Sequence, residues 1–373
     1  MDALFRPLPR HSRRPAHALV RDRLLACIQE GALKEGDRLP PEPDIAARLG
    51  VSRMTANRAI LSLVSDGWLH REKGKGTFVA KAAGTPALRV AIGIPEDPVA
   101  ALDDHYFGAL YWKLRAEFAR RSIGVEAIPL RGGLAKAAQL AGGLGLVAVS
   151  PSKAVLPELR RIADSGAPVV LLGSFWDDDA LGAVDSDNIL GATLAANHLA
   201  DLGHRNILFL GACPGDSNTR DRVRGFQTAL KARGIDPGVP IMMPAVEPFS
   251  PETVQALTAR LTGEDRPTAV FAAGASLAVQ LLGLAHNLGL SVPESLSVVG
   301  YDDPAFLSMA YPPITTVRQP LAEMAAAACD MVAGRLGGGE PAADRRMLDP
   351  ELILRSTTAV PRPDFIPGGK SYA

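Results

Sequence analysis

The longer, carboxyl-terminal part of this chain alternates short, almost continuously apolar runs with stretches of helical periodicity. The apolar runs are Arg89–Ile94, Leu144–Val149, Val169–Leu172, Ile207–Leu210, Ala269–Ala273 and Leu296–Val299. Strands without polar alternation are buried on both faces, which is typical of parallel sheets covered by helices. Roughly 270 residues show this pattern, which is too many for one small sheet. We therefore expect an α/β fold with two Rossmann-like lobes, each a parallel sheet with helices on both faces.

Charge is distributed unevenly, although the whole chain of 373 residues has a formal net charge of zero. Residues 1–80 contain 14 Lys and Arg against 9 Asp and Glu, whereas the rest of the chain contains 26 against 31. A basic segment joined to an acidic remainder indicates that the basic segment binds a polyanion.

Residues 15–80, which we call the head, have the pattern of a small helical module. A first helix is expected over Ala18–Ile28 and a second over about Glu42–Leu49, stopped at Gly50. Ser52 is a good N-cap for a third helix. The inward face of that helix is a stripe at helical spacing, formed by Ala56, Ala59, Ile60, Leu63 and Val64.

Polar side chains at the start of the third helix suggest a helix-turn-helix that reads DNA. Arg53, Thr55, Asn57 and Arg58 lie off the apolar stripe, where the amino end of a recognition helix enters the major groove. Asn can pair with adenine through two hydrogen bonds, and Arg with guanine or phosphate. After Gly67 the chain predicts a two-stranded hairpin with a Gly-Lys-Gly tip, a basic wing suited to backbone or minor-groove contact. An ordinary small helical domain with a charged face is the alternative interpretation.

Five motifs of the head resemble the winged helix-turn-helix of the GntR family. They are Gly36–Glu42, Leu49–Thr55, Arg58-Ala, Asp66–Leu69 and Gly74–Val79. The resemblance implies major-groove contacts from Arg53, Thr55, Asn57 and Arg58, and wing contacts from His70, Lys73, Lys75 and Gly76. The chain departs from the family at Pro43, where the family often has Arg, so a phosphate contact from the second helix is missing or replaced.

Motifs after the head resemble the effector domain of the LacI family, which is itself similar to periplasmic sugar-binding proteins. They are Val184–Asn188, Gly191-Ala, His198–Ile207, Arg222–Phe226, Val292–Asp303, Pro312–Gln319 and Pro350–Ser356. A GntR-type head with such a body is similar to the arabinose repressor group. The resemblance implies two lobes that flank a ligand cleft, with three chain crossings near Leu181–Val184, Thr315–Arg318 and Arg345–Leu348.

The expected domain boundaries follow from these resemblances. The body covers residues 88–360, with a first lobe over about 88–182 and 318–345 and a second over about 183–316 and 346–360. Residues 81–87 form a linker. Residues 1–14 form a basic tail, and 361–373 a second tail.

The same resemblance implies effector contacts at the carboxyl ends of the strands. Arg222 is expected to donate to the ligand and Asp302 to accept from it, with Gln319 near the hinge and Phe249 as an aromatic platform. Weaker expectations in the first lobe fall on Asp104, His105, Tyr106, Phe107, Ser150 and Ser152. Alternatives stay open: Arg222 pairing with Asp216 or Asp221, Asp302 capping the turn before Pro304, and Phe249 as core. Gly274-Ala275 stands where the family often has Asn-Asp, which weakens the sugar interpretation.

Other classes of protein find little support in the sequence. Three scattered cysteines indicate reduced thiols in the cytoplasm and no disulfide framework. The amino terminus lacks a signal-peptide core. The longest apolar stretch, Ala269–Ala285, is too short and interrupted to span a membrane. His105, His198 and His204 lack metal-ligand spacing. We expect no metal and no cofactor.

These observations favour a sequence-specific transcriptional regulator, most often a repressor in such groups. A small molecule, sugar or related metabolite, would control its affinity for a palindromic operator, bound as a homodimer. The alternative is a DNA-binding head fused to a metabolic enzyme. Against an enzyme, the body is too short for the aminotransferase-like domain of some GntR proteins and lacks Gly-x-Ser-x-Gly and P-loop motifs. A purely architectural DNA binder would not need a cleft with Arg222 and Asp302.

Overall fold

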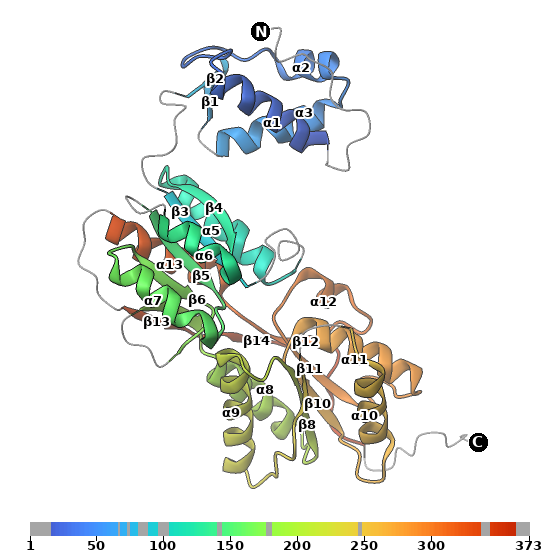
Figure 1. The fold of residues 1–373 in the computed structure, drawn as a ribbon. Helices are drawn as coiled ribbons and strands as arrows, with labels where there is room; N and C mark the ends of the chain where they lie inside the picture. The colour runs from blue at the N-terminus through green and yellow to red at the C-terminus, as the bar shows by residue number, and fades with distance from the viewer. Residues whose placement is uncertain are drawn as a thin grey trace.

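A computed structural model describes residues 16–65, 68–72, 75–80, 89–95, 104–139, 144–176, 181–244, 248–336 and 344–362. The predicted tail 1–14, the linker 81–87 and residues 363–373 of the second tail lie outside these ranges. Figure 1 shows the head followed by two layered lobes.

The head has the expected helices and hairpin. Its elements are α1 (Ala16–Gln29), α2 (Glu42–Leu49), α3 (Arg53–Ser65), β1 (Leu69–Glu72) and β2 (Gly76–Val79). Gly50 ends α2 with a φ of 65°, a left-handed conformation that glycine adopts without strain. The predicted inward stripe of α3 packs with α1 and α2, since Ala56, Ala59, Ile60 and Leu63 are all buried in one cluster.

The first lobe is a parallel sheet of strand order β13-β7-β6-β5-β3-β4. Its strands are β3 (Arg89–Ile94), β4 (Gly124–Pro129), β5 (Leu144–Val149), β6 (Val169–Leu172), β7 (Gly182–Ser186) and β13 (Arg345–Leu348). Its helices are α5 (Phe107–Arg120), α6 (Leu130–Gln139), α7 (Leu156–Asp164) and α13 (Leu321–Leu336), with the short 3-10 helix η2 (Lys153–Val155).

The second lobe is a sheet of strand order β14-β12-β11-β10-β8-β9. Its strands are β8 (Ile207–Ala212), β9 (Ile241–Met243), β10 (Ala269–Ala272), β11 (Ser297–Tyr301), β12 (Thr315–Arg318) and β14 (Glu351–Ile353). Its helices are α8 (Asn188–Asp201), α9 (Ser217–Ala232), α10 (Pro251–Thr262), α11 (Ala275–Asn287) and α12 (Ala305–Met309). The edge strand β14 is antiparallel to β12, an exception to the expected parallel sheet.

Both sheets are covered on two faces, as the continuous apolar runs predict. In β3, Val90 and Ile92 join a cluster with α5 and α13, whereas Ala91 joins the opposite cluster with α6 and α7. In β8, Leu208 packs toward α10 and α11, and Phe209 toward α8 and α9. Successive side chains of a strand point to opposite faces, so each strand must be apolar throughout.

The chain passes between the lobes later than the predicted boundaries at all three crossings. Strand β12 pairs in the second sheet through Arg318, so the second crossing follows Arg318 and not residue 316. Strand β7 pairs with β6 and β13 over its whole length, so the first crossing follows Ser186 and not residue 182. Strand β13 also lies wholly in the first sheet, and the third crossing falls between Leu348 and Glu351. The polar ends of β7 and β13, Asp185-Ser186 and Arg345-Arg346, resemble loop sequence, which explains the early boundaries there.

Helices α8 and α9 lie against each other with almost no space between their backbones. A Cβ atom added to Gly225 of α9 would lie 2.3 Å from the backbone oxygen of Ile189 in α8. Gly225 is therefore required by close packing.

In the part of the chain that the structure describes, no helix combines the length and apolar composition needed to cross a membrane.

We expect Gly225→Ala to lower the free energy of unfolding by about 2 kcal/mol or more, because the methyl group forces the two backbones apart. Gly334→Ala is the matched control, since an added Cβ at this exposed position of α13 meets nothing within 4 Å. The control should be neutral or gain up to about 1 kcal/mol from helix propensity. Urea titrations of both variants measure this, and equal stabilities would contradict the close contact.

Candidate functional site

The amino end of α3 is held in place by a capping hydrogen bond. The hydroxyl of Ser52 accepts from the backbone N–H of Thr55 at 3.1 Å and lies 2.8 Å from the Thr55 hydroxyl. The predicted cap is therefore confirmed. Arg53 and Arg58 are exposed, and so their guanidinium groups are accessible to phosphates or base edges.

The side-chain amide of Asn57 is hydrogen-bonded to the wing. Its Oδ1 accepts a hydrogen bond of 2.9 Å from Nη2 of Arg71 in β1. The same nitrogen of Arg71 donates to Glu42 at the start of α2. A two-bond contact with adenine uses the same oxygen as an acceptor, so Arg71 and the base would share its two lone pairs. Nothing in the sequence indicates this pairing, because Arg71 looks like one more wing cation.

Two of the predicted wing residues lie beside one carboxylate, that of Glu72. Nζ of Lys75 lies 2.9 Å from Glu72, and Nε2 of His70 lies 3.4 Å from it. The hydrogen bond and charge of Lys75, with a smaller contribution from His70, lower the pKa of the Glu72 carboxyl. Gly76 has a φ of 128°, which favours glycine, and Lys73 lies outside the described residues. On DNA binding, a phosphate group would replace Glu72 as the partner of Lys75 and His70.

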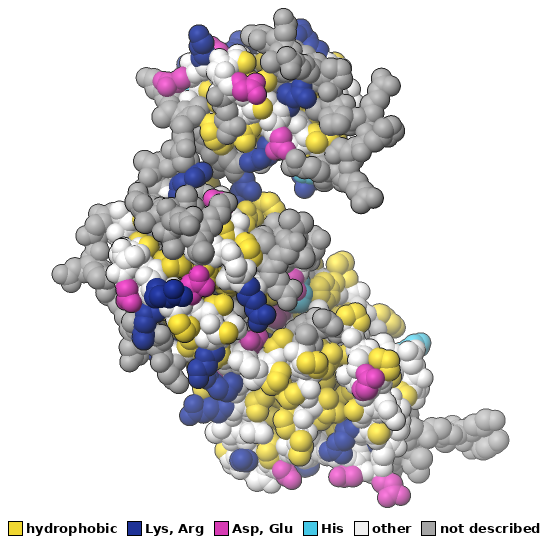
Figure 2. Space-filling view, viewed as in Figure 1, with side chains coloured by type: hydrophobic (Ala, Val, Ile, Leu, Met, Phe, Trp, Pro, Cys, Tyr) yellow, Lys and Arg dark blue, Asp and Glu magenta, His cyan; other side chains and the backbone are white. Residues whose placement is uncertain are grey.

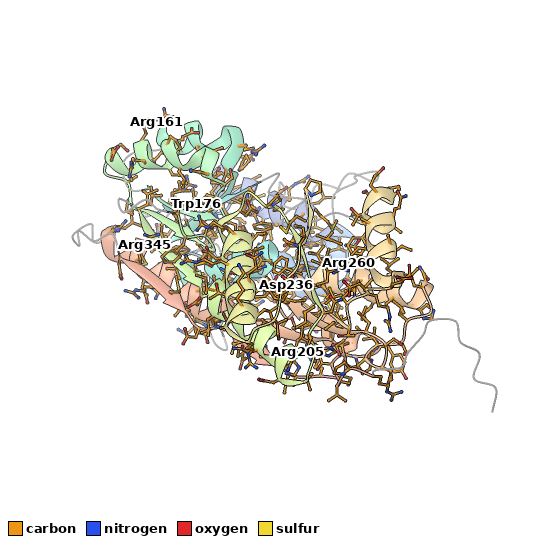
Figure 3. All side chains as sticks on the ribbon, turned by 90° about the horizontal axis from the view of Figure 1, so that it is seen from below. Arg161, Trp176, Arg205, Asp236, Arg260 and Arg345 are labelled. Atoms are coloured by element: carbon orange, nitrogen blue, oxygen red, sulfur yellow. The ribbon has the colours of Figure 1, made fainter. Side chains whose placement is uncertain are left out.

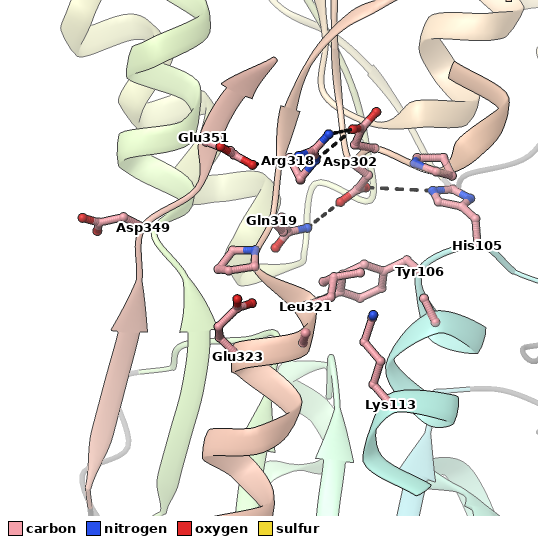
Figure 4. Close-up of a pocket in the computed structure, with 15 residues that line it drawn as sticks. His105, Tyr106, Lys113, Asp302, Arg318, Gln319, Leu321, Glu323, Asp349 and Glu351 are labelled. Atoms are coloured by element: carbon pink, nitrogen blue, oxygen red, sulfur yellow. Dashed lines mark hydrogen bonds and ion pairs between the residues drawn. The ribbon is translucent and has the colours of Figure 1, made fainter. Parts of the chain in front are cut away.

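A cavity of about 680 Å³ lies between the lobes, beside the crossings (Figure 4). Its polar lining comes from the loop before α5, the carboxyl ends of β11 and β12, the amino end of α13 and the third crossing. The polar side chains are His105, Tyr106, Lys113, Asp302, Asp303, Arg318, Gln319, Glu323, Asp349 and Glu351. Figure 2 shows acidic and histidine side chains where the two lobes meet.

Asp302 occupies the centre of the contacts drawn in Figure 4. Its carboxylate accepts from Nε2 of Gln319 at 2.5 Å, and its Oδ2 lies 4.0 Å from Nε2 of His105. The His105 ring also meets Phe306 of α12 edge-on, with ring centres 5.6 Å apart. Residues predicted from separate motifs thus meet across the two lobes, and His105 touches the second lobe at two points.

Arg222 is buried in a polar cluster beneath this cavity and does not line it. Its Nε donates to Asn188 Oδ1 at 2.9 Å, and its Nη1 donates to the carbonyl of Ala273 at 3.0 Å. The guanidinium carbon lies 3.7 Å from the centre of the Tyr301 ring, a cation–π contact. Of the two alternative partners, Asp221 pairs with Arg220 at 3.0 Å. Burial raises the pKa of Asp216, and the nearby charge of Arg222 opposes that rise.

Asp185 extends this cluster into the first lobe and was not singled out from the sequence. It is buried, and its carboxylate accepts from the backbone N–H of Ser186 at 2.8 Å and from Nδ2 of Asn188 at 3.2 Å. Burial raises the pKa of the Asp185 carboxyl to about 7, although the Ser186 hydrogen bond and the charge of Arg222 oppose the rise. A carboxylate inside a buried strand is the sequence signal that could have identified it.

The other predicted first-lobe residues have separate surroundings. Burial raises the pKa of the Tyr106 phenol, whose hydroxyl bonds to Ser150 and lies beside Gly173. Ser150 donates to the Gly173 carbonyl at 3.1 Å. Phe107 packs against the core under α5 and α13, and Ser152 precedes η2. Of this group, the cavity lining contains only Tyr106.

Phe249 also lies away from the cavity lining. Its ring packs against the apolar cluster formed with α10 and α11, and its backbone N–H donates to Gln280 at 2.7 Å. Phe249 is partly buried against this cluster, so both interpretations of Phe249, core residue and aromatic platform, stay open.

A second contact joins the lobes through aromatic side chains after β6. The backbone N–H of Phe175 donates to the Ser217 hydroxyl at 3.2 Å, and Arg220 lies 5.7 Å from the Trp176 ring centre. Arg345 supports this segment by donating to the Trp176 carbonyl at 2.6 Å (Figure 3). The two lobes therefore touch at two places, through His105 and through the segment that follows β6.

Within the described ranges, no group of three or more His, Cys, Asp or Glu is arranged to hold a metal ion. His204 instead bonds to Thr268 at 2.8 Å and to the carbonyl of Ala359 at 2.9 Å.

Two family descriptions match separate parts of the chain. Residues 17–79 match the gntR family of bacterial regulatory proteins, and residues 196–358 match the periplasmic binding protein-like domain. DegA, an HTH-type transcriptional regulator of Bacillus subtilis, is 31% identical over 54% of this chain and 59% of its own length. The arabinose metabolism transcriptional repressor of Geobacillus stearothermophilus is 26% identical over 92% of this chain and 98% of its own.

Solved structures share the fold of the body. A LacI family transcriptional regulator from Enterococcus faecium with bound ribose superposes with a TM-score of 0.63 at 23% identity. The match covers 74% of this chain and all of that one. The expected α/β architecture with two lobes is thus confirmed.

Asp185→Asn should change how stability depends on pH. The unfolded carboxyl releases its proton near pH 4 and the folded one near pH 7, so between these values the unfolded state binds fewer protons and the wild type loses stability as pH rises. The Asn variant lacks this loss. Its unfolding free energy relative to wild type should rise by up to about 1 kcal/mol per pH unit from pH 4 to 7 and then level off. Urea unfolding at a series of pH values measures both proteins. If their unfolding free energies change in parallel with pH, the prediction is wrong.

Proposed function

Because the chain carries a gntR-type DNA-binding domain followed by a periplasmic binding protein-like domain, we propose that it is a transcriptional repressor controlled by a small molecule. The observation that supports control by a small molecule is the cavity between the lobes, which is lined by residues of both. A ligand that contacts both lobes changes the balance between their open and closed arrangements.

The cavity chemistry supports an uncharged, hydroxyl-bearing effector. The Asp302 carboxylate can accept hydrogen bonds from hydroxyl groups, and the Gln319 amide can both donate to them and accept from them. The Tyr106 ring offers an apolar face. Five carboxylates line the cavity against Lys113 and Arg318, a balance that disfavours phosphorylated or carboxylate ligands. A sugar agrees with the named relatives, which include an arabinose repressor and a ribose-bound regulator.

Control of DNA binding, and not catalysis, is the proposed task of the body. The named relatives are transcriptional regulators, and the polar groups of the cavity are engaged in mutual contacts such as Gln319 with Asp302. A protein that binds operator DNA works in the cytoplasm, where a bacterial chromosome lies.

DNA recognition by the head is proposed for Arg53, Thr55, Arg58 and the wing residues His70, Lys75 and Gly76. One winged helix makes few base contacts, so two heads on a palindrome are needed for specificity. We infer a homodimer. Two neighbouring large side chains of the second lobe, Met309 and Tyr311, are 74% and 99% exposed and offer an apolar contact for a second copy.

The function is tested with the full-length protein and a duplex selected by it from random DNA. A thermal-shift screen of sugars, sugar phosphates and nucleosides identifies the effector, since a ligand at 100 times its Kd adds about 2.7 kcal/mol. Fluorescence anisotropy then measures whether the effector changes the affinity for the duplex. If the protein selects no DNA sequence, the proposed repressor function is wrong. If an effector binds but does not change the affinity for the duplex, the proposed control by a small molecule is wrong.

Asp302→Asn should weaken effector binding by about 10- to 100-fold, as expected for loss of a charged hydrogen-bond acceptor, and leave DNA affinity unchanged. Asp201→Asn, at an exposed position of α8 that pairs with Arg233, is the control and should bind effector normally. Calorimetric titration compares the two. Unchanged affinity in Asp302→Asn would remove this residue from the effector site.

Tyr311→Lys should shift the protein from dimer toward monomer, because a charge replaces the most exposed apolar ring. Val239→Lys is the matched control, since Val239 is 84% exposed in a loop after α9. Analytical ultracentrifugation measures both. A Tyr311→Lys dimer as stable as wild type would place the interface elsewhere.

A further inference from the structure

The outward face of α3 begins with an apolar side chain. Met54 is 79% exposed, and it lies on one face of the helix with the exposed Arg58 and with Leu61, which is 46% exposed. The spacing i, i+4, i+7 places these three on one stripe. The core of the head is filled from the opposite face by Ala56, Ile60 and their neighbours, so Met54 does not serve packing.

Hydrogen-bonding groups beside Met54 are engaged within the head. The Thr55 hydroxyl contacts Ser52 at 2.8 Å, and the Asn57 oxygen accepts from Arg71 at 2.9 Å. The Asn57 amide thus already links the wing to α3. Met54 is an accessible apolar group at the position where a recognition helix meets base edges, next to the exposed Arg53 and one turn before the exposed Arg58.

We propose that Met54 reads a thymine in the operator through its 5-methyl group. The major groove presents one apolar feature that distinguishes base pairs, the thymine methyl. The flexible thioether side chain can cover that methyl, while Arg53 and Arg58 neutralise phosphates on either side. Asn57 acts as a positioning residue that holds α3 and the wing together. This inference rests on the proposed function, since it requires the head to bind operator DNA.

The experiment removes the thymine methyl and the Met54 side chain separately and together. The probe is the duplex selected by wild-type protein from random DNA, made once with thymidine and once with deoxyuridine in the half-sites. Wild type should bind the deoxyuridine duplex about fourfold more weakly per contacted methyl, the ratio that corresponds to burial of one methyl group. Met54→Ala should bind both duplexes with equal Kd values.

Two further variants separate Met54 from its surroundings. Leu61→Ala removes an apolar side chain two turns along the same stripe and should keep the full deoxyuridine effect. Asn57→Ala should weaken binding to both duplexes and also keep the deoxyuridine ratio, since its role is positional. The proposal is overturned if wild type binds both duplexes equally, or if Met54→Ala retains the wild-type ratio. If no sequence is selected at all, the repressor function fails instead.

Discussion

Three chain crossings fix the geometry on which the proposed control depends. Strands β7, β12 and β13 each end at the boundary between the lobes, so the two sheets turn their carboxyl edges toward each other. Polar loops after these edges must then face one another. Because the crossings join the lobes covalently, a molecule held between them contacts both, and this is the basis of the proposed control.

Buried polar groups join the lobes behind the cavity. Arg222, Asn188, Asp185 and Tyr301 contact one another through hydrogen bonds and a cation–π contact. A buried charge without partners would cost several kcal/mol, and these contacts offset part of that cost. The cavity around Asp302 has carboxylates in excess, and it is there that we propose an effector binds.

Sequence reasoning succeeded where local pattern decides and failed where tertiary contacts decide. The apolar runs of β3 and β8 and the Ser52 cap are local, and they are in place. Asp302 and Gln319 were implied by separate motifs and do meet. Arg71 and Asn57, or Asp185 and Arg222, come together only through the folded packing, and no spacing in the sequence indicates it. The role of Phe249 is not decided by the sequence for the same reason, because its side chain is apolar in either role.

Asp303 anchors the end of β12, where one crossing begins, to the second lobe. Burial alone would raise its pKa, but hydrogen bonds from Arg355 and Arg318 hold the pKa of this carboxyl below its usual range. Arg318, at the end of β12, donates to Asp303 at 2.7 Å and to Glu351 of β14 at 2.9 Å. Two of the three crossings are therefore clamped on the second-lobe side. Gln319 and residues 348–350 directly adjoin these contacts along the two crossings, so an effector that bound Gln319 would act on the chain at the point where it leaves the second lobe.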